Sequence, residues 1–275
     1  MKRNTYQPRL LYLAVFLCCL SSLTQAHTGD LPYHFHPGLR ISRTKPPTTP
    51  ELTRLMRELS SLSGLPLKVD ADGKIQCDRN LPAVGGSAIA RELLLKAIES
   101  SDSFSVEGAN DSKRIAFAQI EATTSYRDGI NPPQTEWVIR IDFADFAQIG
   151  GDAAAIKAFN PGMNMMHELT HAILKLPDPE GPNDLLGRCE RHLNLMRAEL
   201  GLPLRQYYFP KTRLARSPAS PSQILQGELR FTHQAEELLL TFNIAMVVDG
   251  GLPSSTQSVP PAVAGGSMLA VRNSY

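Results

Sequence analysis

Residues 163–176, MNMMHELTHAILKL, decide the fold, because they carry the run HELTH at positions 167–171 in apolar surroundings. No proline interrupts this segment before Pro177, so we expect a buried helix over residues 163–176. Side chains four positions apart share one face of a helix, which would place His167 and His171 side by side. Buried histidines need partners. The sequence predicts either a shared metal ion or hydrogen bonds from each ring to backbone carbonyls of the core.

The spacing favours the metal, since it is the His-Glu-x-x-His pattern of zinc peptidases. We expect one Zn²⁺ per chain, bound by His167 and His171. Glu168 directly follows the first ligand, where its carboxylate can reach an attacking water molecule but cannot easily bind the metal. Glu168 is therefore the predicted general base.

The third ligand should come from elsewhere in the chain. Residues 172–177 lack the Gly and His that one zincin class carries there, so that class is excluded. Glu190, on a second helix expected over residues 184–200, is the predicted ligand; as an alternative it is a solvated carboxylate paired with Arg197. The other candidates for the ligand are Asp184, His192 and Glu180.

Residues 167–172, Glu190, the stretch 193–205 (LNLMRAELGLPLR) and Tyr208 together resemble the effector-type zinc metallopeptidases of pathogenic bacteria. The similarity covers roughly residues 135–210. It implies a compact gluzincin-like fold and the cleavage of host proteins. The chain departs from that family in carrying a secretory signal, and in having Leu193 where the family often has Glu, which bears on the third ligand.

A peptidase also needs a donor for the oxyanion that forms during hydrolysis. Tyr208 is the predicted donor, and Tyr207, Arg205 and His192 are the other candidates. Residues 136–142 form the clearest strand pattern in the chain. By analogy with zincins we expect this strand to pair with an extended substrate; the alternative is an interior strand anchored by Trp137.

The remaining pattern predicts an α+β fold, in which a small mixed or antiparallel sheet packs on the active-site helix and the following ligand helix. Further helices are expected at 50–62, 87–100 and 152–159, and further strands at 65–69, 74–77, 104–107, 114–120, 225–233 and 237–248. The expected organisation is a signal peptide (1–26), an extended arm (27–49), a zincin-like domain (50–215), a C-terminal hairpin (216–250) and a disordered tail (251–275).

The first 26 residues have a basic start, a short apolar core and a small residue, Ala26, at the expected cleavage point. We therefore predict a secreted or periplasmic protein without stable membrane insertion after cleavage. Cleavage removes three positive charges from a chain of net charge +1, and a near-neutral chain offers no electrostatic reason to bind nucleic acid. Cys77 and Cys189 remain, either as one disulfide or as two separate thiols.

These features predict a secreted zinc-dependent metallopeptidase acting on a protein or peptide. The alternative is a catalytically inactive zincin-like binding module that keeps a structural zinc ion. An intact Glu168 favours the enzyme, because a purely structural zinc site has no use for a base beside a water molecule.

Overall fold

The HELTH run lies on helix α6 (Pro161–Leu174) in a computed structural model of the chain. Pro161 occupies the first turn, and the side chain of Asn160 caps the helix by accepting a hydrogen bond from the Met163 N–H at 2.8 Å. Lys175, with a φ of 54°, adopts the left-handed conformation that ends the helix. The predicted helix is confirmed, starting and ending two residues earlier than expected.

The structure describes residues 36–78, 80–109, 112, 115–125, 134–181, 183–216 and 223–244. The expected signal peptide and C-terminal tail lie outside the described residues. From Pro37 onward the described residues belong to one unit. None of the described helices is long and apolar enough to cross a membrane.

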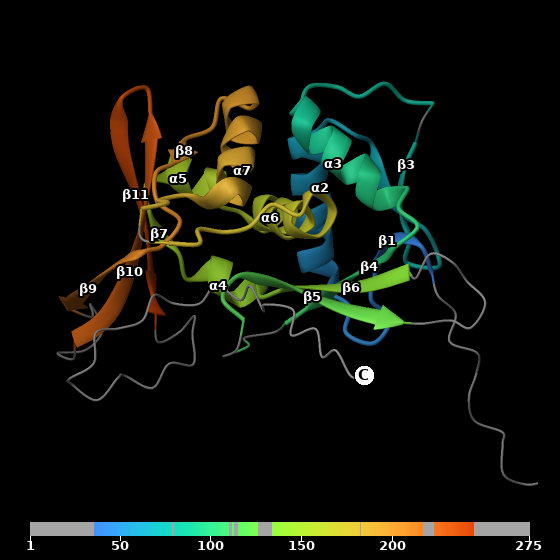
Figure 1. Ribbon diagram of the computed structural model, residues 1–275, viewed down its shortest axis with the longest axis horizontal. Helices are drawn as coiled ribbons and strands as arrows, with labels where there is room; N and C mark the ends of the chain where they lie inside the picture. Colours follow the sequence, from blue (N-terminus) through green and yellow to red (C-terminus); the bar gives the residue numbers. More distant parts are fainter. Residues whose placement is uncertain are drawn as a thin grey trace, which may run out of the picture. The chain divides into compact units, whose positions relative to one another are not determined.

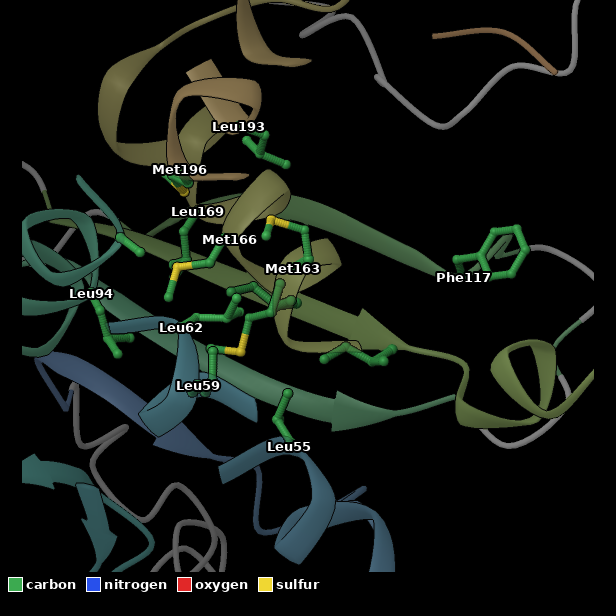
Figure 2. Close-up of a cluster of buried hydrophobic side chains, with 14 of the residues drawn as sticks. Leu55, Leu59, Leu62, Leu94, Phe117, Met163, Met166, Leu169, Leu193 and Met196 are labelled. Atoms are coloured by element: carbon green, nitrogen blue, oxygen red, sulfur yellow. The ribbon is translucent and has the colours of Figure 1, made fainter. Parts of the chain in front are cut away.

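Helix α6 lies at the centre of the core (Figure 1). It contacts helices α2 (Thr49–Ser63), α3 (Ala88–Ile98) and α7 (Gly187–Glu199), and strands β5 (Ala118–Ser125) and β6 (Gln134–Ile141). Leucine and methionine side chains from these four helices gather in one apolar cluster (Figure 2). Burial on all sides explains why α6 is apolar around most of its circumference. Two short helices, α4 (Phe143–Ala147) and α5 (Ala153–Ala158), complete the helical part of the described chain.

A mixed sheet packs against α6. Its strand order is β1 (Gly38–Ile41), β4 (Ser103–Gly108), β6 and β5, and only β5 runs antiparallel to its neighbour. Strand β6 is paired on both edges, so the expectation that it binds an extended substrate is wrong. The alternative is confirmed, because β6 is interior and Trp137 stacks on Phe104 with ring centroids 6.3 Å apart. The outer edge of this sheet is β5.

Two antiparallel sheets complete the α+β fold. The larger contains β7 (Gly150–Gly151), β11 (Glu236–Asn243), β10 (Gln223–His233) and β8 (Leu204–Arg205), with β9 (Lys211–Arg216) also paired to β10. The smaller is the expected hairpin of β2 (Leu67–Val69) and β3 (Ile75–Cys77). Phe231 and Leu240 of the β10–β11 hairpin belong to the same apolar cluster as α6. Apolar residues on both sides of the domain boundary predicted near residue 215 therefore share one core.

The arm expected over residues 27–49 is also revised, since β1 pairs in parallel with β4. Leu39 has no exposed surface. Strands in parallel sheets are buried on both faces, so the four residues of β1 do not alternate between apolar and polar. The sequence therefore lacked the alternation that usually indicates a strand. Cys77 and Cys189 are both free thiols, so the disulfide does not form.

Replacing Leu39 with Ala tests the position of β1 in the core. We expect the free energy of unfolding, measured by urea denaturation, to fall by about 2–5 kcal/mol, since the change leaves a cavity. The control is Leu214→Ala, at a side chain that is 65% exposed, where about 0.5 kcal/mol or less is expected. Equal small effects at both sites would contradict the assignment of β1 to the core.

Candidate metal centre

Helix α6 brings the two predicted histidine ligands together. The Nε2 atoms of His167 and His171 lie 2.9 Å apart, and the two rings are nearly perpendicular, with centroids separated by 4.6 Å. Spacing of four residues on a helix accounts for this approach. The expected pairing of His167 with His171 is thus present in the structure.

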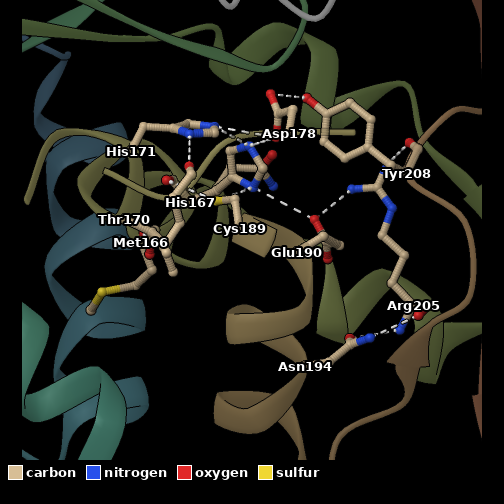
Figure 3. A network of polar contacts seen from close by, with 12 residues as sticks. Met166, His167, Thr170, His171, Asp178, Cys189, Glu190, Asn194, Arg205 and Tyr208 are labelled. Atoms are coloured by element: carbon tan, nitrogen blue, oxygen red, sulfur yellow. Dashed lines mark hydrogen bonds and ion pairs between the residues drawn. The ribbon is translucent and has the colours of Figure 1, made fainter. Parts of the chain in front are cut away.

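Asp178 completes this group from the loop after α6. The chain turns back beyond Lys175, and Asp178 Oδ1 comes to lie 3.3 Å from the Nε2 atom of each histidine (Figure 3). Oδ1 is buried and has no hydrogen-bond partner among the described residues. Its companion oxygen, Oδ2, accepts a hydrogen bond from the Tyr208 hydroxyl at 2.7 Å. A buried acceptor without a hydrogen bond, aimed at two histidines, indicates a place for a cation.

The spacing of these atoms fits a small tetrahedral ion. Ligand atoms about 2.0–2.1 Å from a tetrahedral metal lie about 3.3 Å from one another. The distances of 2.9 and 3.3 Å among the three atoms are close to that value. Together with Cys189, whose sulfur lies within 4.8 Å of them, these residues form a cluster that could hold a metal ion.

The opposite nitrogen of each ring is held by a different partner. His171 Nδ1 lies 2.7 Å from the carbonyl oxygen of Leu176. His167 Nδ1 faces a carboxylate oxygen of Glu190 and the sulfur of Cys189, each at 3.5 Å. Partners of this kind fix the orientation of a metal-binding histidine, and they leave both Nε2 atoms directed at the common site.

Charge in the site is balanced between Asp178 and the histidines. Burial by itself would lower the pKa of His171, but the nearby Asp178 carboxylate and Cys189 sulfur outweigh it and raise that pKa to about 10. Burial would likewise raise the pKa of Asp178, yet His167 and His171, each 3.3 Å away, hold that pKa well below its ordinary value. Asp178 is therefore ionised at neutral pH, as a metal ligand must be, whereas His171 is protonated and would release a proton on binding a metal ion.

Glu190, the predicted third ligand, lies beside the site but is bound elsewhere. It is fully buried and forms ion pairs with Arg197 and, at 3.1 Å, with Arg205. Burial would raise its pKa, but the two arginines hold that pKa well below its usual range. Its only contact with the histidines is to Nδ1 of His167, on the far side of the ring from Asp178. Asp178, and not Glu190, thus belongs to the cluster that could hold a metal ion.

The alternative ligands lie outside this cluster, and the alternative oxyanion donors Arg205 and Tyr207 have other contacts. Asp184 pairs with Arg191 at 2.7 Å. His192 interacts with Glu92 and Lys96 of α3, and Glu180 lines a neighbouring hollow with Tyr207. Arg205 is bound to Glu190 and to two backbone carbonyls.

Tyr208, the favoured oxyanion donor, is buried, with its hydroxyl on Asp178 and its ring stacked on His167 at 5.9 Å. In this geometry its hydroxyl orients a ligand and does not face open space.

Glu168 lies between α6 and the edge of the mixed sheet. Its side chain is buried, and the backbone of Ile120 in β5 is near enough to favour its ionised form. Burial raises the pKa of this carboxyl, and the neighbouring His167 and His171 partly oppose the rise. A carboxylate with a raised pKa is better suited to accept and return a proton near neutral pH.

We compared the chain with known proteins. No protein-family model, no curated protein and no solved structure matches it. The similarity to effector-type peptidases stays a prediction from the residues. The functional assignment therefore depends on the site itself.

Replacing Asp178 with Asn tests its role as a ligand. We expect zinc affinity, measured by competition with a chromogenic chelator, to fall by more than about 100-fold, since losing partners outside the ligand shell already costs about 10–100-fold. Asp184→Asn changes a carboxylate of the same loop that pairs with Arg191, and it should bind zinc as the unmodified protein does. Wild-type affinity in Asp178→Asn would contradict the assignment.

Proposed function

We propose that this chain is a zinc-dependent metallopeptidase. The observation that carries the proposal is the convergence of His167 Nε2, His171 Nε2 and the unbonded Asp178 Oδ1 beside Glu168. Two imidazoles and one carboxylate form an established type of catalytic zinc site, which keeps one further position open. When bound, a zinc ion supplies Lewis-acid polarisation of a carbonyl group and of a water molecule.

Glu168 has the position and the environment of a general base. It follows His167 directly on α6, and burial raises its pKa toward the working range. In the proposed reaction its carboxylate accepts a proton from the attacking water molecule and later delivers that proton to the leaving amine. Tyr208 holds Asp178 in place, which supports a positioning role in preference to the predicted oxyanion donation.

The substrate, a protein or peptide, would lie along β5. In the described part of the chain no strand pairs with the outer edge of β5, and the Ile120 backbone of this strand lies near Glu168. An extended peptide can add to such an edge through main-chain hydrogen bonds that require little sequence preference. We therefore propose that the substrate pairs with the edge strand β5 and not, as the sequence predicted, with β6.

One observation favours a second candidate, the inactive module with a structural zinc ion. Cys189 lies within 4.8 Å of the other candidate ligand atoms, and a fourth protein ligand would close the site. Against this, its sulfur faces Nδ1 of His167 and hydrogen-bonds the His167 carbonyl oxygen at 3.6 Å. The two nitrogens of one ring cannot bind the same ion, so the contact of the Cys189 sulfur with Nδ1 argues against its joining an ion bound at Nε2, although the sulfur also lies near His171. The geometry favours the open site.

We further propose that the protein acts outside the cytoplasm, as predicted from its first 26 residues, which lie outside the described part of the chain. An oxidising compartment is compatible with two free cysteines when neither sulfur can reach the other. Cys189 is fully buried against His167, and Cys77 belongs to the β2–β3 hairpin.

Replacing Glu168 with Gln tests the enzymatic function. With β-casein as the substrate, we expect cleavage to fall by about 10²–10⁴-fold while one zinc ion per chain is retained, because the change removes the base and no ligand. Glu92→Gln, at an exposed position of α3, is the control and should cleave like the unmodified protein. If zinc binds but neither the unmodified protein nor any variant cleaves casein or a peptide panel, the structural-zinc module is the correct assignment.

A further inference from the structure

A largely apolar hollow of about 450 Å³ adjoins the metal centre. One wall is the loop between α6 and α7, which carries Asp178 and contributes Pro179 and Leu185. The opposite wall is the segment after β8, which contributes Tyr207 and Phe209. The volume falls in the range of pockets that hold small ligands or single side chains.

Tyr208 separates this hollow from the metal centre and joins its two walls. Its hydroxyl bonds to Asp178, and its N–H donates to the carbonyl oxygen of Leu185, both at 2.7 Å. One side of its ring faces His167, with ring centroids 5.9 Å apart, and Phe209 meets it edge-on at 5.0 Å. A group bound in the hollow therefore lies about one side chain away from the histidines.

Two exposed apolar side chains line this hollow. Leu185 is 54% exposed and Phe209 is 36% exposed. Single exposed apolar side chains are ordinary, but two that line one concavity next to a reactive site indicate a binding pocket. Burying them under a ligand would stabilise the complex in proportion to the apolar area removed from water.

The charged groups around the hollow favour an uncharged occupant. Asp184 is neutralised by Arg191 at 2.7 Å. Lys211 lies over the Tyr207 ring at 5.4 Å, and Glu180 supplies the opposite charge on the same lining. Neither sign of charge therefore predominates, and a charged side chain would gain nothing that offsets its loss of hydration.

We propose that this hollow is the subsite for a large apolar side chain, such as Phe, Leu or Met, next to the scissile bond of the substrate. The inference rests on the proposed peptidase function and adds a substrate preference to it. Leu185 and Phe209 are the residues that determine specificity. Main-chain pairing along β5 would position the peptide, and the hollow would select its side chain.

Binding is tested first, without any cleavage. N-acetyl-phenylalaninamide, N-acetyl-alaninamide and N-acetyl-lysinamide are titrated into the zinc-loaded, full-length Glu168→Gln protein. The Leu185 methyl groups are followed by NMR, and in the Leu185 variant the ring protons of Phe209, which lines the same hollow, are followed instead. We expect saturable shifts with the phenylalanine amide alone. Leu185→Asp should abolish that binding, whereas Leu195→Asp should keep it, since Leu195 is equally exposed (55%) but lies on α7 outside the hollow.

Cleavage is tested second, by mapping the bonds cut in β-casein with mass spectrometry. We expect one flank of the cut bonds to favour large apolar residues over Ala by at least about tenfold. Leu185→Asp should remove this preference while Leu195→Asp retains it.

The outcomes separate the two proposals. Cleavage without side-chain preference and without methyl shifts would overturn the subsite and leave the peptidase standing. Methyl shifts without any cleavage would overturn the peptidase and leave an apolar-side-chain site. Absence of both results would overturn both proposals.

Discussion

The cost of burying polar groups within the core is the constraint on which the structure of the site depends. Helix α6 is packed by helices and strands, yet it carries His167 and Glu168 into that environment, with His171 partly buried beside them. Both histidines face Asp178 in the loop after α6, and His167 also faces Glu190 of α7. The loop that returns Asp178 to the histidines is therefore as much a part of the fold as the helix itself.

A second layer of charge holds this arrangement in place. Glu190 binds Arg197 and Arg205, and it also faces Nδ1 of His167. Breaking a buried network of this kind by removing one partner leaves an uncompensated charge, which is strongly destabilising. The stretch that carries these arginines thus has a structural role: it fixes the carboxylate that faces the first histidine.

Much of the fold was predictable because it depends on local patterns. Spacing of apolar residues located α2, α3 and α6, and alternation located β6 and the β10–β11 hairpin. The position of β6 between β4 and β5 was not predictable, since the pairing partners of a strand are set by chain topology. The same limit explains the third ligand: Asp178 follows Pro177 in a loop, and only the left-handed turn at Lys175 returns it to the histidines. A carboxylate directly after a helix-ending proline was the one available signal.

Loading the protein with zinc and recording its X-ray absorption spectrum tests the central claim, that the site is an open one made by His167, His171 and Asp178. Our account predicts only nitrogen and oxygen neighbours, at about 2.0–2.2 Å, with the scattering pattern of two imidazoles. A sulfur neighbour at about 2.3 Å would place Cys189 in the coordination shell and contradict the open catalytic site.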